Sequence, residues 1–105
     1  MMTVKNISGL YDNLKNENLI FLNYLKAKFP IFHNSNFFFR DFQYGLKGFL
    51  EEKGTSLSDN NLASLAKQFS EYYENEGIFV KTSTQGWKIN YPDFITTKPG
   101  DPFSF

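Results

Sequence analysis

The sequence predicts a small α+β domain that is mostly α-helical and ends in a β-hairpin. Three observations support this fold class. Apolar residues recur at three- and four-residue spacing in three segments, which are residues 16–29, 40–53 and 58–76. After Gly77 the pattern changes to alternation over residues 78–91, as is typical of strands. Residues 83–86 in the middle of that segment have the length of a hairpin turn, so three helices and one hairpin should form a single domain over residues 16–91.

The composition is that of one small globular domain. The chain has 105 residues, of which 41% are hydrophobic and 21% are charged. A chain of this size buries roughly two-thirds of its unfolded surface, which is enough for one core. Cysteine is absent, which excludes disulfide scaffolds, thiolate nucleophiles and zinc ribbons. Because the chain shows no signal peptide and no apolar run near the ~20 residues of a membrane helix, we expect a cytoplasmic protein without a membrane role.

The two ends of the chain are expected to lie outside the helical core. Residues 1–15 form the N-terminal arm. Leu10 and Leu14 share a helical face, so we expect a helical turn or two there, either before the first helix or as an extension of it. Residues 92–105 contain three prolines, which favours an extended or flexible tail. Phe94 is the residue of this tail that we expect to dock on the domain.

The first helix is predicted over residues 16–29, with Asn16 as its N-cap and Pro30 at its end. Its apolar residues, which we expect to be buried, are Leu19, Phe21, Leu22, Leu25 and Phe29. The sequence allows two structures for the aromatic run Phe37–Phe39 that follows. It is either a short strand or the first turn of the next helix, in which case Asn36 would be the N-cap.

The second helix, residues 40–53, should end before Gly54, which suits the left-handed position after a helix. Its buried stripe is predicted to be Phe42, Leu46, Phe49 and Leu50. Gly45 and Gly48 lie inside this helix, where each glycine costs about 1 kcal/mol relative to alanine. They are three residues apart and share one side, so we attribute them to close packing against a neighbour and not to a hinge.

The third helix has the strongest local signature in the chain. Ser58 is the predicted N-cap, and Leu57 and Leu62 have the spacing of a hydrophobic staple. Gly77 is the predicted stop after residues 58–76. The expected buried stripe is Leu62, Leu65, Ala66, Phe69 and Tyr73.

No arrangement of residues favours catalysis. The single histidine, His33, lies in a polar loop without a second histidine or a nearby acid. Glu71 and Glu74 share a helical face, but they lack the further oxygen ligands that a calcium or magnesium site needs. No glycine-rich phosphate loop follows a strand. We therefore expect no enzyme activity, no metal and no cofactor.

The order helix, helix, capped helix and hairpin over residues 16–91 resembles the winged helix-turn-helix superfamily. The resemblance implies a short strand before the second helix that pairs with the hairpin, and Phe37–Phe39 would supply it. It also implies that the third helix enters the major groove of DNA while the hairpin, as the wing, contacts the adjacent backbone. The nucleic-acid-binding residues that follow from it are Asn60, Asn61, Ser64, Lys67, Gln68, Lys81, Gln85 and Lys88.

The distribution of charge argues against DNA binding. The third helix carries one cation, Lys67, beside four acidic residues, and the whole chain is neutral. Affinity for DNA depends mainly on neutralising phosphates, so a monomer with this surface should bind weakly. Arg40 is the one arginine available for bidentate contacts to guanine or phosphate.

Two hypotheses follow from the resemblance and the charge. The first is a regulatory DNA-binding domain, placed slightly ahead because DNA binding is the commonest use of such a fold. The alternative is a winged-helix-like module that binds a protein partner or a second copy of itself and does not bind DNA. For this alternative we expect Glu71, Glu74 and Phe79 to form the contact surface.

Overall fold

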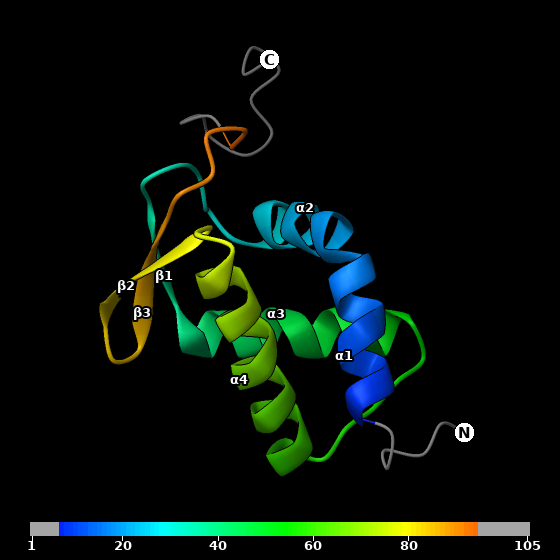
Figure 1. Cartoon of the computed structure of the whole chain (residues 1–105). Helices are drawn as coiled ribbons and strands as arrows, with labels where there is room; N and C mark the ends of the chain where they lie inside the picture. Colours follow the sequence, from blue (N-terminus) through cyan, green and yellow to red (C-terminus); the bar gives the residue numbers. More distant parts are fainter. Residues whose placement is uncertain (1–6, 95–105) are drawn as a thin grey trace.

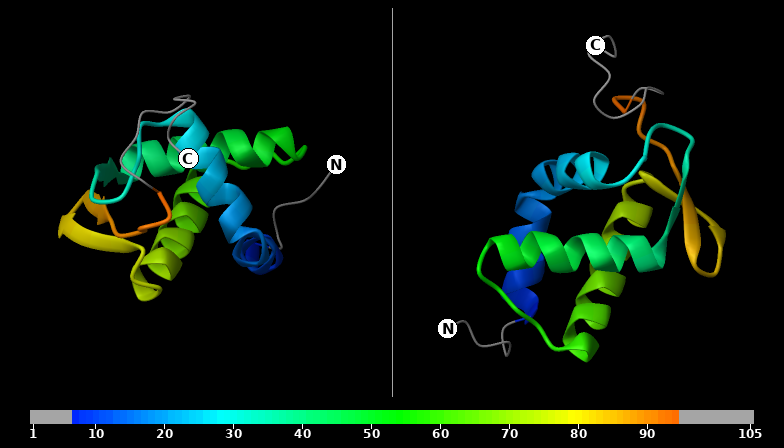
Figure 2. Two further views of the ribbon diagram at one scale, coloured as in Figure 1. Left: turned by 90° about the horizontal axis from the view of Figure 1, so that it is seen from above. Right: turned by 180° about the vertical axis from the view of Figure 1, so that it is seen from behind.

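The computed structural model of the chain describes residues 7–94 (Figure 1). Within this range the helices are α1 (Ile7–Asn16), α2 (Asn18–Lys28), α3 (Phe39–Glu52) and α4 (Asp59–Asn75). The strands are β1 (Asn36–Phe38), β2 (Phe79–Ser83) and β3 (Gly86–Ile89). The domain is therefore α+β and mostly helical, as predicted. The sheet lies at one end of the molecule, and α3 runs from the sheet toward α1 (Figures 1 and 2).

The N-terminal segment packs on the rest of the domain. α1 is a helix of its own that meets α2 at a sharp bend (Figure 1). Leu10 and Leu14 are buried, and α1 packs on α4. Asn16 ends α1 and does not cap α2, so its predicted role is wrong. The backbone N–H of Glu17 still donates to the carbonyl of Asn13 at 3.0 Å, so the chain bends at this point without a new cap.

The buried face of α2 is narrower than predicted. Phe21, Leu22 and Leu25 are buried, whereas Leu19 is 57% exposed. Successive helical residues are separated by about 100°, which places Leu19 about a third of a turn from the centre of the buried stripe. Ile20 beside it is also exposed. The apolar spacing therefore identified the helix and three residues of its buried face, but it wrongly included Leu19, and Phe29 is only half-buried.

The ends of α3 and α4 follow the predictions. The hydroxyl of Ser58 accepts a hydrogen bond from the backbone N–H of Asn61 at 3.2 Å, which confirms the N-cap. Gly54 and Gly77 follow the two helices with φ angles of 83° and 78°. These positive angles favour glycine and let the chain leave each helix without strain. Every residue of the two predicted buried stripes is buried.

The sheet has the order β1-β3-β2, and both pairings are antiparallel. β1 pairs with β3 across Phe37 and Trp87, which confirms the strand interpretation of the aromatic run. Phe39 begins α3, and its backbone N–H donates to the carbonyl of Gln85 at 2.8 Å. Asn36 therefore does not cap α3, because the extended chain of β1 separates it from the helix. The residue before the helix is Phe38, which makes no side-chain cap.

The core lies between the three longer helices and the inner face of the sheet. Phe21 of α2, Phe42 of α3 and Phe69 of α4 meet with ring centroids 5.2–6.0 Å apart. Each helix thus contributes one ring to a common centre. Aromatic pairs at such separations add about 0.5–1.5 kcal/mol beyond the burial of their surface.

Phe79 is part of this core, which overturns its predicted role in protein contact. It is 2% exposed, and its ring lies 4.8 Å from Trp87 and 4.9 Å from Tyr73. Phe79 pairs with Ile89 on the face of the sheet that the helices cover. Its neighbour Val80 points to the other face and is 45% exposed. The alternation was recognised in the sequence, but its phase was assigned to the wrong face.

The loop before β1 is tied to the end of the described chain. Nδ1 of His33 accepts a hydrogen bond from the backbone N–H of Tyr91 at 3.0 Å, and the backbone N–H of His33 donates to the carbonyl of Phe94 at 2.7 Å. Phe94 is buried, which confirms its predicted docking. Residues 1–6 and 95–105, which include most of the predicted tail, lie outside the described residues.

A candidate binding cleft between α4 and the hairpin

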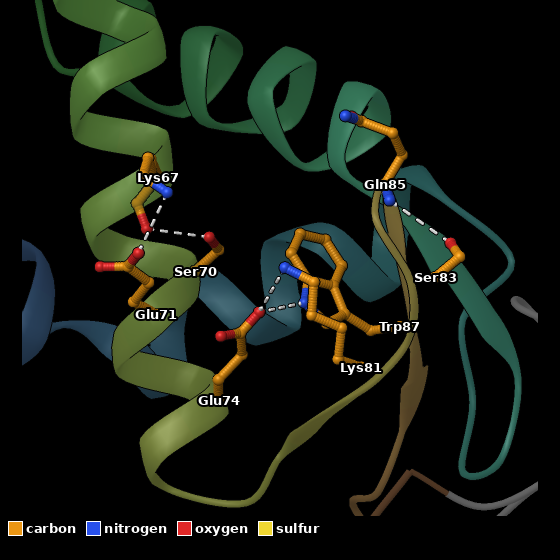
Figure 3. Close-up of polar contacts among 8 residues, drawn as sticks. All are labelled: Lys67, Ser70, Glu71, Glu74, Lys81, Ser83, Gln85 and Trp87. Atoms are coloured by element: carbon orange, nitrogen blue, oxygen red, sulfur yellow. Dashed lines mark hydrogen bonds and ion pairs between the residues drawn. The ribbon is translucent and has the colours of Figure 1, made fainter.

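The predicted site residues fall on two elements, α4 and the hairpin. Most of them are exposed, and Asn61 is half-buried beside the N-cap. The structure brings Lys67, Lys81 and Gln85 to one cleft of about 220 Å³. The cleft is also lined by Phe39, Ser70, Glu71, Glu74, Thr84 and Trp87. Figure 3 shows how the side chains of α4 face those of the hairpin across it.

Glu74 joins the two walls of the cleft (Figure 3). The indole N–H of Trp87 donates to Oε2 of Glu74 at 2.6 Å, and Nζ of Lys81 lies 3.9 Å from the same oxygen. Trp87 is 3% exposed, so its N–H needs a partner within the protein. Glu74 supplies that partner and also lies within ion-pair distance of Lys81.

Lys67 is also paired within the cleft. Its Nζ lies 3.3 Å from Oε2 of Glu71, one helical turn further along α4. Both side chains are largely exposed, so the pair contributes at most a few tenths of a kcal/mol to stability. The hydroxyl of Ser70 donates to the backbone carbonyl of Lys67 at 3.0 Å. The pair also offsets the charge of Lys67 on the face that was predicted to contact DNA.

The two hairpin lysines lie on opposite faces of the sheet. Lys81 is opposite Trp87 in the register, on the face that packs against the helices. Lys88 is opposite both Val80 and Asn36, on the outer face. Because side chains alternate along a strand, the two lysines cannot contact one stretch of DNA backbone from the same side of the wing. The structure therefore does not gather Lys88 with the other predicted site residues.

Sequence reasoning missed the hydrogen bond between Trp87 and Glu74. One signal could have indicated it. A tryptophan on the inner face of a hairpin is buried, and a buried indole N–H usually has an acceptor. Glu74 is an acid in the last turn of the helix that leads into the hairpin, so it was a candidate acceptor.

Clusters of metal ligands and membrane-spanning helices are both absent from the described part of the chain. Across residues 7–94, no three histidine or acidic side chains come close enough to hold a metal ion. None of the helices in this range is long and apolar enough to cross a membrane. Comparison of the chain with protein families, with curated proteins and with solved structures finds no match.

Proposed function

We propose that this chain is a winged-helix-like module that binds another protein and does not read duplex DNA. The winged-helix part of the proposal is supported by the element order α2, β1, α3, α4, β2, β3 and by the sheet order β1-β3-β2. A short strand before the second helix of that set pairs with the hairpin, as the resemblance implies.

The charges in the cleft favour a protein over DNA as the partner. A winged helix that binds DNA presents its recognition helix and its wing to phosphates. Here Lys67 and Lys81, the cations at that place, are paired with Glu71 and Glu74. Binding to DNA would require both pairs to open and would bring two carboxylates toward the phosphates. These carboxylates would repel the phosphates and so reduce the gain that counterion release normally supplies.

DNA binding remains a second candidate because of the first half of α4. Asn60, Ser64 and Gln68 are exposed along this half. Amide side chains can make bidentate hydrogen bonds to adenine in the major groove, and a serine hydroxyl can reach a phosphate or a base. These residues would suit a domain that a larger basic complex holds on DNA.

The first test is the anisotropy of labelled duplex DNA at about 50 and 200 mM salt, the range over which phosphate contacts change affinity most clearly. We expect no salt-dependent binding by the unmodified protein. The double variant Glu71→Gln/Glu74→Gln should gain weak binding at the lower salt concentration, because it frees two lysines and keeps an acceptor for Trp87. Its salt slope should rise by about 1 for each lysine that reaches a phosphate.

The matched control for this test is Glu52→Gln/Asp93→Asn, which makes the same change in net charge at exposed positions outside the cleft. An equal gain in the control would mean that net charge and not the cleft limits DNA binding. Steep, salt-dependent binding by the unmodified protein that disappears in Lys67→Glu/Lys81→Glu would contradict the proposal and establish the DNA candidate.

The positive test for protein binding is selection of peptides displayed on phage against the folded domain. The proposal predicts that a shared motif is enriched relative to selection against an unrelated immobilised protein. Absence of an enriched motif, together with a single monomeric species in sedimentation velocity, would contradict it.

A further inference from the structure

A second hollow surface lies on the opposite side of α3 from the core, and we call it the Tyr44 groove. It consists of two hollows that share Tyr44 and Lys47 on their rims. The first hollow, about 320 Å³, lies between α2 and α3 over Phe29 and the α3 backbone at Gly45 and Gly48. The second, about 380 Å³, lies over Phe39 and Leu62. Both floors are therefore largely apolar.

Tyr44 itself is the most exposed of the large apolar side chains that the structure describes, at 73%. It stands between the two hollows, so a ligand that filled both would cover its ring. Tyrosine gives a large contact area at low entropic cost and is enriched among the residues that dominate protein interfaces. An exposed tyrosine between two apolar hollows has the form of such a contact.

The cations around the groove differ from those of the cleft in their ion pairing. Lys28, Lys47 and Arg40 line its rims. Within the described residues, none of the three has a carboxylate within ion-pair distance, whereas Lys67 and Lys81 in the cleft both have one. Acidic side chains line the groove at Glu51 in the first hollow and at Asp59 in the second. The rim is thus basic around Tyr44 and carries one acid in each hollow.

We propose that the Tyr44 groove binds an acidic segment of a partner protein. An aromatic or aliphatic side chain of that segment occupies each hollow, and its carboxylates meet Lys28, Arg40 and Lys47. This inference rests on the proposed function and names the surface and the kind of partner. A peptide suits the mixed rim because it can place single carboxylates against the cations. A nucleic-acid strand would bring a continuous row of phosphates past Glu51 and Asp59, which the charges of these residues oppose.

The test uses a fluorescein-labelled peptide of twelve residues in which Asp and Glu alternate with Phe and Leu. Its control has Asn and Gln in place of the acids. We expect the acidic peptide to bind at least about tenfold more tightly than the amide peptide at moderate salt. Addition of the acidic peptide should also shift the backbone amide resonances of Gly45 and Gly48 in ¹⁵N–¹H spectra, since both glycines line the first hollow.

Matched variants locate the binding. Lys47→Glu and Tyr44→Ala should each weaken the acidic peptide by about tenfold or more. Lys88→Glu and Leu19→Ala make the same kinds of change on other exposed surfaces and should leave its affinity within about twofold. All four positions are exposed, and far-UV circular dichroism checks that each variant is folded.

Three results would overturn the inference. They are equal affinity for the acidic and amide peptides, unchanged binding in Tyr44→Ala, and tighter binding of a labelled twelve-nucleotide dT strand than of the acidic peptide. The last result would assign the groove to single-stranded nucleic acid. If phage selection yields a motif that binds elsewhere on the domain, the Tyr44 groove fails while the protein-binding function stands.

Discussion

Both glycines of α3 allow a neighbouring side chain to pack closely, but the two positions should differ in how well they tolerate a Cβ atom. A Cβ atom at Gly45 would lie 2.5 Å from Cδ2 of Leu25 and 3.2 Å from Cε2 of Phe29. Leu25 is fully buried and has no free space to move into. A Cβ atom at Gly48 would lie 2.6 Å from the hydroxyl oxygen of Tyr24, which is half-buried and can rotate toward solvent. The same residue type in one helix thus meets a rigid neighbour and a movable one.

We expect Gly45→Ala to be less stable than Gly48→Ala. At Gly45 the overpacking costs about 1–3 kcal/mol, against which the better helix propensity of alanine returns about 1 kcal/mol. The free energy of unfolding should therefore fall by up to about 2 kcal/mol. At Gly48 the propensity gain should leave the protein unchanged or up to about 1 kcal/mol more stable. Urea denaturation followed by Trp87 fluorescence measures both, and the reverse order of stability would contradict the packing argument.

Between elements, a hydrogen bond from an indole to a carboxylate joins α4 to the hairpin. It depends on one carboxylate, Glu74, which accepts from the buried indole of Trp87 and pairs with Lys81. Removal of the carboxylate leaves a buried donor without a partner, which costs more than the loss of an exposed ion pair. Glu71, three residues earlier, makes only the exposed pair with Lys67 and provides the comparison.

Glu74→Ala should lower the free energy of unfolding by about 1–3 kcal/mol, whereas Glu74→Gln should lose much less because its amide oxygen still accepts from the indole. Glu71→Ala should change stability by less than about 0.5 kcal/mol. Thermal unfolding monitored through the tryptophan, the single one in the chain, measures all three variants. Equal losses for Glu74→Ala and Glu71→Ala would show that the indole bond does not stabilise the hairpin.

Local sequence signals predicted most helices and strands. They did not predict every buried face or ion pair, because these depend on tertiary contacts. Ser58, Gly54 and Gly77 mark helix ends through their own backbone geometry, so sequence alone was sufficient there. Which face of α2 or β2 is buried depends on the elements that pack against it. Leu19 and Phe79 were therefore both assigned to the wrong side. Five of the residues that line the cleft were predicted site residues, namely Lys67, Glu71, Glu74, Lys81 and Gln85. The cleft itself was not predicted, because it depends on the angle at which α4 and the hairpin pack.

Across the whole molecule, Tyr73 connects the centre of the core to the N-terminal part of the chain. Its hydroxyl donates to the backbone carbonyl of Asn18 at 2.9 Å, so α4 is bonded to the start of α2. The ring packs against Phe42, Phe69 and Phe79. Burial raises the pKa of Tyr73 well above its ordinary value, with smaller contributions from Tyr72 and Tyr91.

This raised pKa predicts a loss of stability in alkali. The unfolded chain ionises its tyrosines near pH ~10, whereas the folded protein keeps Tyr73 protonated. Unfolding therefore releases a proton above about pH 10, and the free energy of unfolding falls as the pH rises, by up to about 1.4 kcal/mol per pH unit for this residue. Below that pH the contribution of Tyr73 is complete and independent of pH.

Tyr73→Phe should be about 1 kcal/mol less stable than the unmodified protein at neutral pH, because it lacks the hydrogen bond. Its stability should fall less steeply in alkali. Some slope should remain, because burial also raises the pKa values of Tyr24 and Tyr72. Urea denaturation at several values between about pH 8 and 11, at constant ionic strength, measures the two slopes. Identical slopes would show that Tyr73 ionises as easily in the folded protein as in the unfolded chain.

The strand order has a consequence for how the chain is made. β3 is the central strand of the sheet, yet it is the last of the three to leave the ribosome. Until it emerges, β1 and β2 have no strand between them, and the inner-face rings Phe37 and Phe79 cannot be covered by Trp87. In a nascent chain, such unpaired strands are prone to aggregation and can be bound by chaperones. We therefore expect the sheet to form only after β3 has been synthesised and can pair with both β1 and β2.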